Sequence, residues 1–221
     1  MSSKYPRTYH LPWSPGGTND DKKLPSIDGF LSRPGQENIL VITEKLDGSN
    51  SCLTTEGVFA RSHGKISTHP AFDYLKGIWA GILGQLEPGE EIFGENCFAV
   101  HSITYDALSS YFFVFNIRKN GRWLSYDEVV SRAQELGLTT VPLLYRGVIL
   151  SEKEFISLTN KTMKEKSFFG GEREGFVVRT IDSFKDNDFS TNVAKYVRAN
   201  HVQTSDHWMH QKITKQVLKK L

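Results

Sequence analysis

A lysine between an apolar run and a glycine-containing turn is the residue in this sequence best suited to covalent chemistry. Residues 39–42 are apolar, and Glu44-Lys45-Leu46-Asp47-Gly48-Ser49-Asn50 follows. A strand would fix the stem of Lys45, and the turn would leave room for a ligand phosphate near its amine. Lysine attacks only as the neutral amine, so burial or nearby cations must lower its pKa. Taken alone, a surface lysine before an Asp-Gly hairpin turn is the simpler explanation.

Four further segments combine an apolar strand with ionic residues at its end. In chain order they are Phe93-Gly94-Glu95-Asn96, Tyr111-Phe112-Phe113-Val114-Phe115-Asn116, Glu174-Gly175-Phe176-Val177-Val178-Arg179 and Ala194-Lys195-Tyr196-Val197-Arg198. Each could be an ordinary strand with a charged terminus. Together with the lysine turn they form a series of five that is not expected by chance.

The five segments resemble the motifs of the covalent nucleotidyltransferases, the superfamily of DNA ligases, RNA ligases and mRNA capping enzymes. Lys45-x-Asp47-Gly48 resembles motif I, and the other four segments resemble motifs III, IIIa, IV and V. The resemblance runs from Ile39 to Arg198 and is nearest to RNA ligase 2 of phages and its bacterial relatives. In that branch a glutamate precedes the lysine and an asparagine follows it five residues later, as Glu44 and Asn50 do.

The resemblance implies that Lys45 attacks the α-phosphate of ATP, releases pyrophosphate and carries AMP. Lys195 would neutralise the α-phosphate, and Glu174 would support the metal or the nucleotide, which makes Lys45, Lys195 and Glu174 the predicted catalytic group. The residues predicted to bind ATP or AMP are Glu44, Lys45, Asn50, Arg61, Glu95, Phe115, Arg179 and Lys195.

Within that set the resemblance assigns separate tasks. Glu44 would read the adenine edge, Phe115 would stack on the adenine, and Arg61 would contact phosphate. Mg²⁺ or Mn²⁺ would be held by Glu95, Glu174 and Asp47, largely through water, which suits hard cations. The cations Lys195 and Arg179 are also expected to oppose protonation of Lys45.

Two positions depart from the family pattern. Motif V commonly has a second basic residue two positions after its lysine, where this chain has Val197. Arg198 is a substitute only if the strand is irregular, because neighbouring strand residues face opposite sides. Motif IIIa often has aspartate after the phenylalanine, where this chain has Asn116.

The segment before the first motif is rich in aromatic, basic and small polar residues. Residues 1–36 are predicted to form an arm, residues 37–200 the adenylylation domain, and residues 201–221 a C-terminal amphipathic helix with no separate OB-fold domain. One hypothesis is that Arg7, His10 and Trp13 of the arm, together with Arg198, grip RNA through stacking and phosphate contacts. The alternative is an arm packed across a sheet with its rings buried.

Strand-like runs with helices between them predict an α+β fold with antiparallel sheets whose loops form a cleft. The resemblance implies that helices flank these sheets and that the cleft holds a nucleotide. The resemblance identifies this as the ATP-grasp-like adenylation fold of ligases. Helices are predicted at 71–86, at 126–136 after a Ser125/Glu128 capping box, and at 155–163. Strands are predicted at 39–44, 57–61, 91–100, 111–118, 141–150, 175–181 and 193–198.

The composition of the 221 residues is that of an ordinary globular protein. The net charge is +2, so an RNA-binding surface requires local clustering of the 27 Lys and Arg residues. Two cysteines favour buried thiols over a disulfide framework. Without a leader or a long apolar stretch, a cytoplasmic monomer is expected.

The predicted function is ATP-dependent joining of RNA 3′-OH and 5′-phosphate ends through lysyl-AMP and 5′-adenylylated RNA. The alternatives are a minimal DNA nick-sealing ligase and an inactive RNA-binding descendant.

Overall fold

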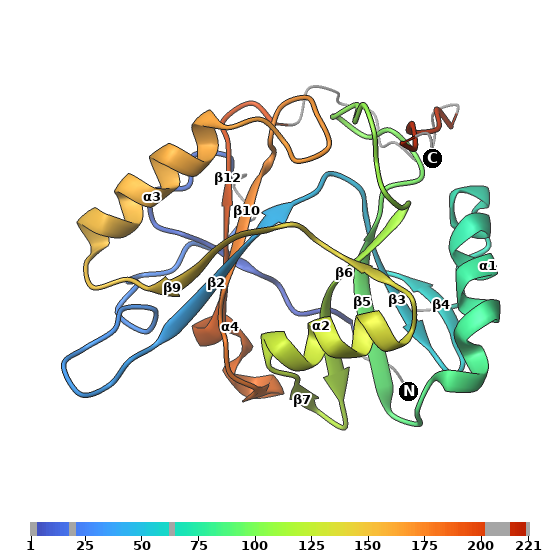
Figure 1. The fold of residues 1–221 in the computed structure, drawn as a ribbon, viewed down its shortest axis with the longest axis horizontal. Coiled ribbons are helices and arrows are strands. Elements are labelled where there is room, and N and C mark those ends of the chain that lie inside the picture. The colour runs from blue at the N-terminus through green and yellow to red at the C-terminus, as the bar shows by residue number, and fades with distance from the viewer. Residues whose placement is uncertain (1–3, 18–20, 62–64, 202–212, 220–221) are drawn as a thin grey trace.

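The computed structural model describes residues 4–17, 21–61, 65–201 and 213–219. Two β-sheets lie side by side, with one long helix outside the first sheet and another outside the second (Figure 1). Most strand pairs are antiparallel, and the exceptions are β1 with β12 and β6 with β8. The predicted α+β class with antiparallel sheets is therefore confirmed.

The first sheet has the strand order β1-β12-β10-β2-β9. Its strands are Tyr9–His10, Val193–Val197, Gly175–Thr180, Ile39–Lys45 and Leu143–Val148. The second sheet has the order β11-β7-β6-β5-β3-β4, with β8 pairing beside β6. Its strands are Phe184–Lys185, Arg122–Trp123, Phe112–Lys119, Glu90–Asn96, Ser49–Thr54, Gly57–Ala60 and Thr139–Thr140.

The chain passes from the first sheet to the second at Asp47 and Gly48. Sequence analysis treated the residues after Lys45 as a turn and missed β3, which begins at Ser49. β2 and β3 belong to different sheets, so the Asp-Gly turn is not a hairpin. The turn therefore brings the end of β2 to the border between the sheets.

Among the described residues, α1 (Asp73–Ile82), α2 (Tyr126–Glu135) and α3 (Glu152–Lys164) lie where helices were predicted, whereas the short α4 (Phe189–Asn192) had no counterpart in the prediction. The 3-10 turns are at Pro70–Phe72, Leu83–Gln85 and Asp186–Asp188. The capping box at α2 is complete, because Ser125 and Glu128 each bond the other's backbone. Ser151 caps α3 in a similar way.

The arm packs on the outer face of the first sheet. Leu11, Leu24, Ile27 and Phe30 are buried against the strands and α3. β1 pairs with β12, and His10 also bridges to Lys23. For this part of the arm, the alternative of a packed segment is correct.

The end of the chain differs from its prediction. Most of the expected helix at 201–221 lies outside the described residues, but residues 213–219 are extended and not helical. Single bridges join Lys215 to Ala99 and Leu218 to Leu108. The buried Gln216 amide accepts from the Tyr105 N–H and donates to the carbonyl of Ile103. These tertiary hydrogen bonds replace the local ones that the helical pattern predicted.

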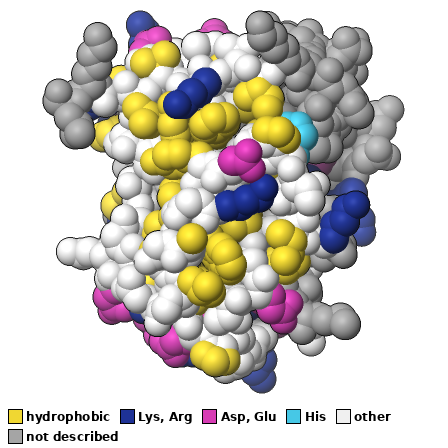
Figure 2. All heavy atoms as spheres, turned by 90° about the vertical axis from the view of Figure 1, so that its right-hand side faces the viewer, with side chains coloured by type: hydrophobic (Ala, Val, Ile, Leu, Met, Phe, Trp, Pro, Cys, Tyr) yellow, Lys and Arg dark blue, Asp and Glu magenta, His cyan; other side chains and the backbone are white. Residues whose placement is uncertain are grey.

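Figure 2 shows the face that carries α1, where hydrophobic side chains form a broken band with single charged side chains between them. Tyr74 and Leu83 are partly exposed here, while Leu75 and Ile82 are buried in the core beside the second sheet. Cys52 and Cys97 are buried, as expected. Within the described ranges, no helix combines the length and apolar character needed to cross a membrane.

Candidate active site

A cleft of about 670 Å³ opens between the two sheets. Its volume lies within the usual range for small-ligand sites. All the residues predicted to bind nucleotide line it: Glu44, Lys45, Asn50, Arg61, Glu95, Phe115, Arg179 and Lys195. The site therefore gathers residues from β2, β3, β5, β6, β10 and β12 at one position in the fold.

The first sheet presents its cleft residues in rows across three strands. Val177 of β10 pairs with Thr43 on one side and Lys195 on the other, and Gly175 pairs with Lys45 and Val197. Side chains two apart on a strand share a face. Lys45 and Lys195 therefore lie on the same face, in neighbouring rows.

Glu174 holds the amine of Lys45. The Nζ of Lys45 lies 2.8 Å from Oε1 of Glu174 and 3.0 Å from its Oε2, and this carboxylate is buried. Gly175 allows the close strand contact beside it, because a Cβ there would lie 1.9 Å from the carbonyl oxygen of Tyr196. This glycine keeps Glu174 directly opposite the end of β2.

The charge around Lys45 is opposite to the expectation. Burial acts to lower its pKa, but the nearby carboxylates of Glu174, Glu95 and Asp47 outweigh burial and raise the pKa above the ordinary lysine value. Lys45 and Lys195 repel each other as expected, but this repulsion does not outweigh the carboxylates, so the net pKa of Lys45 is raised and not lowered. Three carboxylates surround one ammonium group.

The same crowding acts on the carboxylates. Burial raises the pKa of Glu95 to about 8, with Lys45 opposing the rise and Glu174 adding to it. Burial also raises the pKa of Glu174 to about 7. The backbone N–H of Gly48 bonds to Glu95 and lowers its pKa slightly. A Cβ at Gly48 would lie 2.6 Å from the carbonyl oxygen of Asn96, so the tight turn at this position requires glycine.

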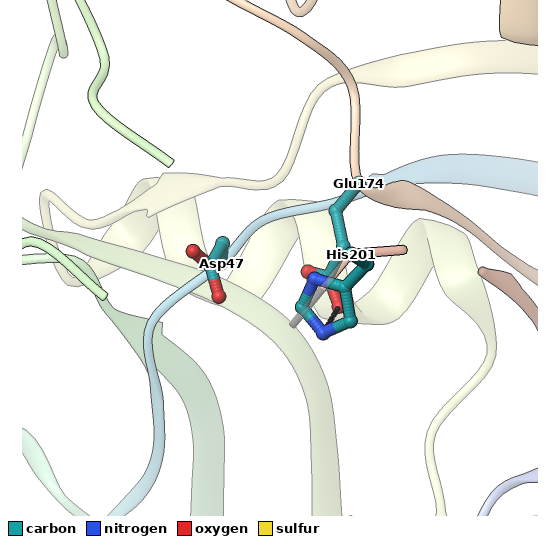
Figure 3. A group of neighbouring side chains, drawn as sticks. All are labelled: Asp47, Glu174 and His201. Carbon is teal, nitrogen blue, oxygen red and sulfur yellow. Dashed lines mark ion pairs between the residues drawn. The ribbon is translucent and has the colours of Figure 1, made fainter. Parts of the chain in front are cut away.

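Asp47 and His201 lie close to the Glu174 carboxylate. One oxygen of Asp47 accepts backbone hydrogen bonds from Ser102 and Ile103, both at 2.7 Å. Nε2 of His201 lies 3.2 Å from Oε1 of Glu174, and its buried Nδ1 has no hydrogen-bond partner among the described residues. Figure 3 shows Asp47, Glu174 and His201 together, and their ligand atoms lie within 4.8 Å of one another. Sequence analysis did not assign His201 to the site.

A β-bulge lies where the second sheet faces the cleft. Phe93 pairs with Asn116, but the next residue, Gly94, pairs with Val114, so Phe115 has no partner in the ladder. A bulge lets neighbouring residues share a side of the strand. Phe115 and Asn116 consequently both line the cleft.

Tyr5 of the arm enters the cleft beneath Phe115. Its ring lies 5.3 Å from Phe115, 5.0 Å from Phe93 and 5.2 Å from Phe189, mostly edge to face. Burial raises the pKa of Tyr5 to about 12. The aromatic content of the arm is evident from the sequence, but the contact of Tyr5 with Phe115 is not.

Asn116 explains one departure from the family pattern. Its amide oxygen accepts a 2.7 Å hydrogen bond from Nη1 of Arg179, and its amide nitrogen donates to the Tyr5 hydroxyl at 3.5 Å. An aspartate could not donate this second bond. Arg179 also bonds the carbonyl oxygens of Thr180 and Leu124, so it is fixed in the cleft wall.

Glu44 and Asn50 have buried oxygens that remain unused. Oε2 of Glu44 accepts from the backbone N–H of Phe168 at 3.0 Å, and Arg173 lies 3.8 Å away. Within the described ranges, Oε1 of Glu44 and Oδ1 of Asn50 have no hydrogen-bond partner. Buried polar atoms are normally paired, so both oxygens can accept a bond from a ligand. Arg61 lies exposed at the end of β4 and lines the cleft.

The residues predicted to bind RNA have different surroundings. Arg7 is exposed and lines the cleft, whereas His10 is 1% exposed and cannot stack on RNA at the surface. The Trp13 ring packs against Phe155 and donates to Thr159. Arg198 pairs with Glu172.

Val197, the second departure, has no room for a basic side chain. It is buried, and a Cβ on Gly16 of the arm would lie only 2.7 Å from its Cγ1. A longer residue at 197 would displace the arm from β12. Arg198 pairs with Glu172, so its guanidinium faces that carboxylate.

Solved ligases share this fold. An archaeal ATP-dependent RNA ligase (form 1) is 16% identical with a TM-score of 0.56, over 88% of this chain and 48% of that one. A Naegleria gruberi RNA ligase, as an E227A mutant with ATP and Mn, is 19% identical with a TM-score of 0.58, over 89% and 56%. A putative ATP-dependent DNA ligase from Aquifex aeolicus is 23% identical with a TM-score of 0.54, over 88% and 50%. The chain thus spans about half the length of these structures.

No protein with a curated description matches the chain. The family model described as RNA ligase matches residues 38–197, from the first strand of the adenylylation motifs to the last. This match covers well over half of the sequence and includes Lys45, Glu95, Glu174 and Lys195. On these grounds the chain belongs to the RNA ligase family.

Proposed function

We propose that this protein is an ATP-dependent RNA ligase of the RNA ligase 2 type, which joins RNA 3′-OH and 5′-phosphate ends. The supporting observation is the position of Lys45 beside a buried carboxylate, in a cleft that all the predicted nucleotide-binding residues line. Nζ of Lys45 attacks the α-phosphate, and the bond to pyrophosphate breaks. AMP then passes to the RNA 5′-phosphate, and the 3′-OH displaces it.

Lys45 must lose a proton before it attacks. Glu174 contacts Nζ through both oxygens, and burial raises its pKa to about 7, so it is the nearest group able to take that proton. A base of this strength is suited to proton transfer near neutral pH. Glu174 therefore holds the amine before ATP binds and is the nearest acceptor for its proton. Because the pKa of Lys45 lies above that of Glu174, this transfer requires the positive charge that a divalent cation would supply.

The carboxylates fit a divalent cation. Asp47, Glu95 and Glu174 outnumber Lys45, and Asp47, Glu174 and His201 can direct ligand atoms at one point. Carboxylates and imidazole together suit Mn²⁺ as well as Mg²⁺. When bound, the cation supplies positive charge beside the phosphate oxygens and opposes protonation of Lys45. The Naegleria gruberi ligase structure with ATP and Mn supports this requirement.

The remaining residues hold the nucleotide. Lys195 and Arg61 neutralise the phosphates, and Phe115 stacks on the adenine with Tyr5 supporting it from below. Oε1 of Glu44 accepts from the adenine amino group, and Oδ1 of Asn50 accepts from a ribose hydroxyl. Such transfer depends chiefly on positioning and charge neutralisation.

Intact-mass measurement after incubation with ATP and Mg²⁺ tests the first step. We expect one AMP per chain on Lys45 and none in Lys45→Ala. Lys45→Arg should also fail, because a guanidinium does not lose its proton at usable pH. ATP should be preferred to GTP. An adduct that persists in Lys45→Ala, or equal labelling from GTP, would contradict the assignment.

A sealing assay tests the substrate. Nicks with a pre-adenylylated 5′ end and either an RNA or a DNA 3′-OH end should be sealed faster when that end is RNA. Discrimination requires contact with 2′-OH groups, which DNA lacks. Equal or faster sealing of the DNA end would favour a DNA nick-sealing ligase, and adduct formation without sealing of either end would argue against both.

A further inference from the structure

The second cleft lysine, Lys195, is held by the arm. Nζ of Lys195 lies 3.3 Å from Oδ1 of Asp21, a residue that no family motif includes. The other oxygen of Asp21 lies 3.5 Å from Nε2 of His10, which is completely buried. β1 brings His10 into register with Lys195, and the N–H of Leu11 donates to the Lys195 carbonyl oxygen at 2.8 Å. One acidic side chain of the arm, Asp21, therefore contacts Lys195 of the sheet, and one basic side chain, His10, contacts the other oxygen of the same carboxylate.

The imidazole is itself fixed from behind. Nδ1 of His10 lies 2.8 Å from the hydroxyl of Ser14, and this hydroxyl accepts a 2.9 Å bond from the backbone N–H of Val197. With the hydrogen on Nε2, Nδ1 accepts from the Ser14 hydroxyl and Nε2–H faces the Asp21 carboxylate. With the hydrogen on Nδ1, that N–H donates to Ser14, whose hydroxyl then donates to the carbonyl oxygen of Val197 at 3.3 Å. These contacts link the backbone of Val197 through Ser14, His10 and Asp21 to the side chain of Lys195, which lies two residues earlier on the same strand.

We propose that Asp21 and His10 are a positioning pair for Lys195. The pair directs the ammonium group of Lys195 at the α-phosphate and keeps this group charged during transfer. This inference rests on the proposed function. It also gives His10 a task that agrees with its burial, in place of the RNA contact expected from the sequence.

The charges around Lys195 support this role. Burial lowers its pKa, Lys45 and Arg61 lower it further, and Asp21 acts in the opposite direction. Lys195 in turn lowers the pKa of Glu174, of His201 and of His10, whose own pKa is about 4, mainly because of burial. His10 is therefore neutral at neutral pH. Asp21 is the anion that the arm contributes against these cations.

The test compares Asp21→Asn with Asp28→Asn, the same change at an exposed position of the arm. The pKa of Lys195 is read from the ε-carbon in ¹³C-lysine-labelled protein, with assignment by Lys195→Arg. We expect Asp21→Asn to lower this pKa by about one unit, because a carboxylate within 4 Å commonly shifts a pKa by one unit or more. Asp28→Asn should leave it unchanged, and Asp21→Glu should restore most of it.

The rate of Lys45 adenylylation gives the functional readout. In a plot of this rate against pH, the fall at alkaline pH should move to lower pH by the same amount in Asp21→Asn. At pH values above this fall, the rate should be about tenfold lower than in the parent protein. The acidic limb and the melting temperature should change little. An unchanged Lys195 pKa, or an equal change in Asp28→Asn, would overturn the pair. If the pKa moves but the parent protein forms no AMP adduct, the ion pair stands and the proposed function fails.

Discussion

The two sheets supply their site residues in different ways. Across β2, β10 and β12 of the first sheet, Lys45 and Lys195 follow a regular register, and Gly175 between them sets the spacing of the strands; the register shift of β2 lies on its other side, against β9. In the second sheet, a bulge presents Phe115 and Asn116 together, and Tyr5 from the arm supports them. A regular register fixes the distances among charged groups, whereas a bulge allows a ring to be positioned for a flat ligand. We therefore expect the first sheet to control the rate of transfer and the second to control nucleotide affinity.

The largest effect is expected at Lys195. Lys195→Met should slow adenylylation by about 100- to 1,000-fold, the usual cost of losing one group that stabilises transition-state charge. ATP affinity should change little, and melting should stay within a few degrees because Lys195 is at the edge of the core. Rapid-quench kinetics with separate ATP titrations would distinguish rate from affinity. A large fall in melting temperature would show that the residue is structural.

Phe115 should give the opposite result. Phe115→Ala should weaken ATP binding by about 1–3 kcal/mol, the usual contribution of an aromatic ring stacked on a base. The rate at saturating ATP should be nearly retained. Phe168→Ala, which removes an exposed ring outside the cleft wall, is the control. Calorimetric titration with ATP would measure both, and equal losses in the two variants would remove the distinction between the sheets.

The buried carboxylates predict a smaller effect on stability. The folded-state pKa of Glu95, about 8, lies above its unfolded value, so Glu95 stabilises the fold below the unfolded pKa of about 4.5. That contribution is lost as the pH rises towards 8. In chelator, Glu95→Gln should therefore melt higher than the parent protein at pH 8. A difference of about 1 kcal/mol corresponds to roughly 2–4 °C in a chain of this size.

The comparison with pH 5 is the control for this prediction. There Glu95 is protonated in the folded protein, so the parent and Glu95→Gln should melt at nearly the same temperature. Added Mg²⁺ should reduce the difference at pH 8 by stabilising the parent alone. A difference that does not depend on pH would mean that the glutamine acts through packing.

Arg7 should have the smallest effect, and only on RNA. It lines the cleft from the arm and belongs to neither sheet. Arg7→Ala should reduce the slope of log affinity against log salt by about 0.7–0.9, the contribution of one phosphate contact. Arg33→Ala, which removes an exposed arginine of the arm outside the cleft, should leave the slope unchanged. Filter binding over a salt series would measure this, and equal slopes for all three proteins would remove Arg7 from the RNA surface.

Much of the first sheet could be predicted because an apolar run is a local property. The strand ending at Lys45, the strand beginning at Gly175 and the strand containing Lys195 are recognisable as short apolar runs with ionic residues at or near their ends. The caps at Ser125 and Ser151 were equally local. The family resemblance then placed these strands around one nucleotide, and all the predicted nucleotide-binding residues meet in the cleft.

The missed features depend on contacts between distant segments. The bulge at Phe115 is defined by its partner β5, and the position of Tyr5 by the rings beneath it. The sign of the pKa change at Lys45 depends on carboxylates from three separate strands and turns, whose spacing the sequence does not contain. At 213–219, the helical spacing of apolar residues was real, but hydrogen bonds to residues 98–108 determined the backbone.

The pairing of β1 with β12 also sets an order for folding during synthesis. Tyr9 and His10 leave the ribosome early, but their partners Ala194 and Lys195 follow only near the end of the chain. Parallel pairing over such a separation forms slowly, because a large loop must close first. We expect Lys195 to gain its ion pair with Asp21 among the last contacts of the native state. A nascent chain would therefore carry a formed α2 and α3 long before the residues of the cleft are in place.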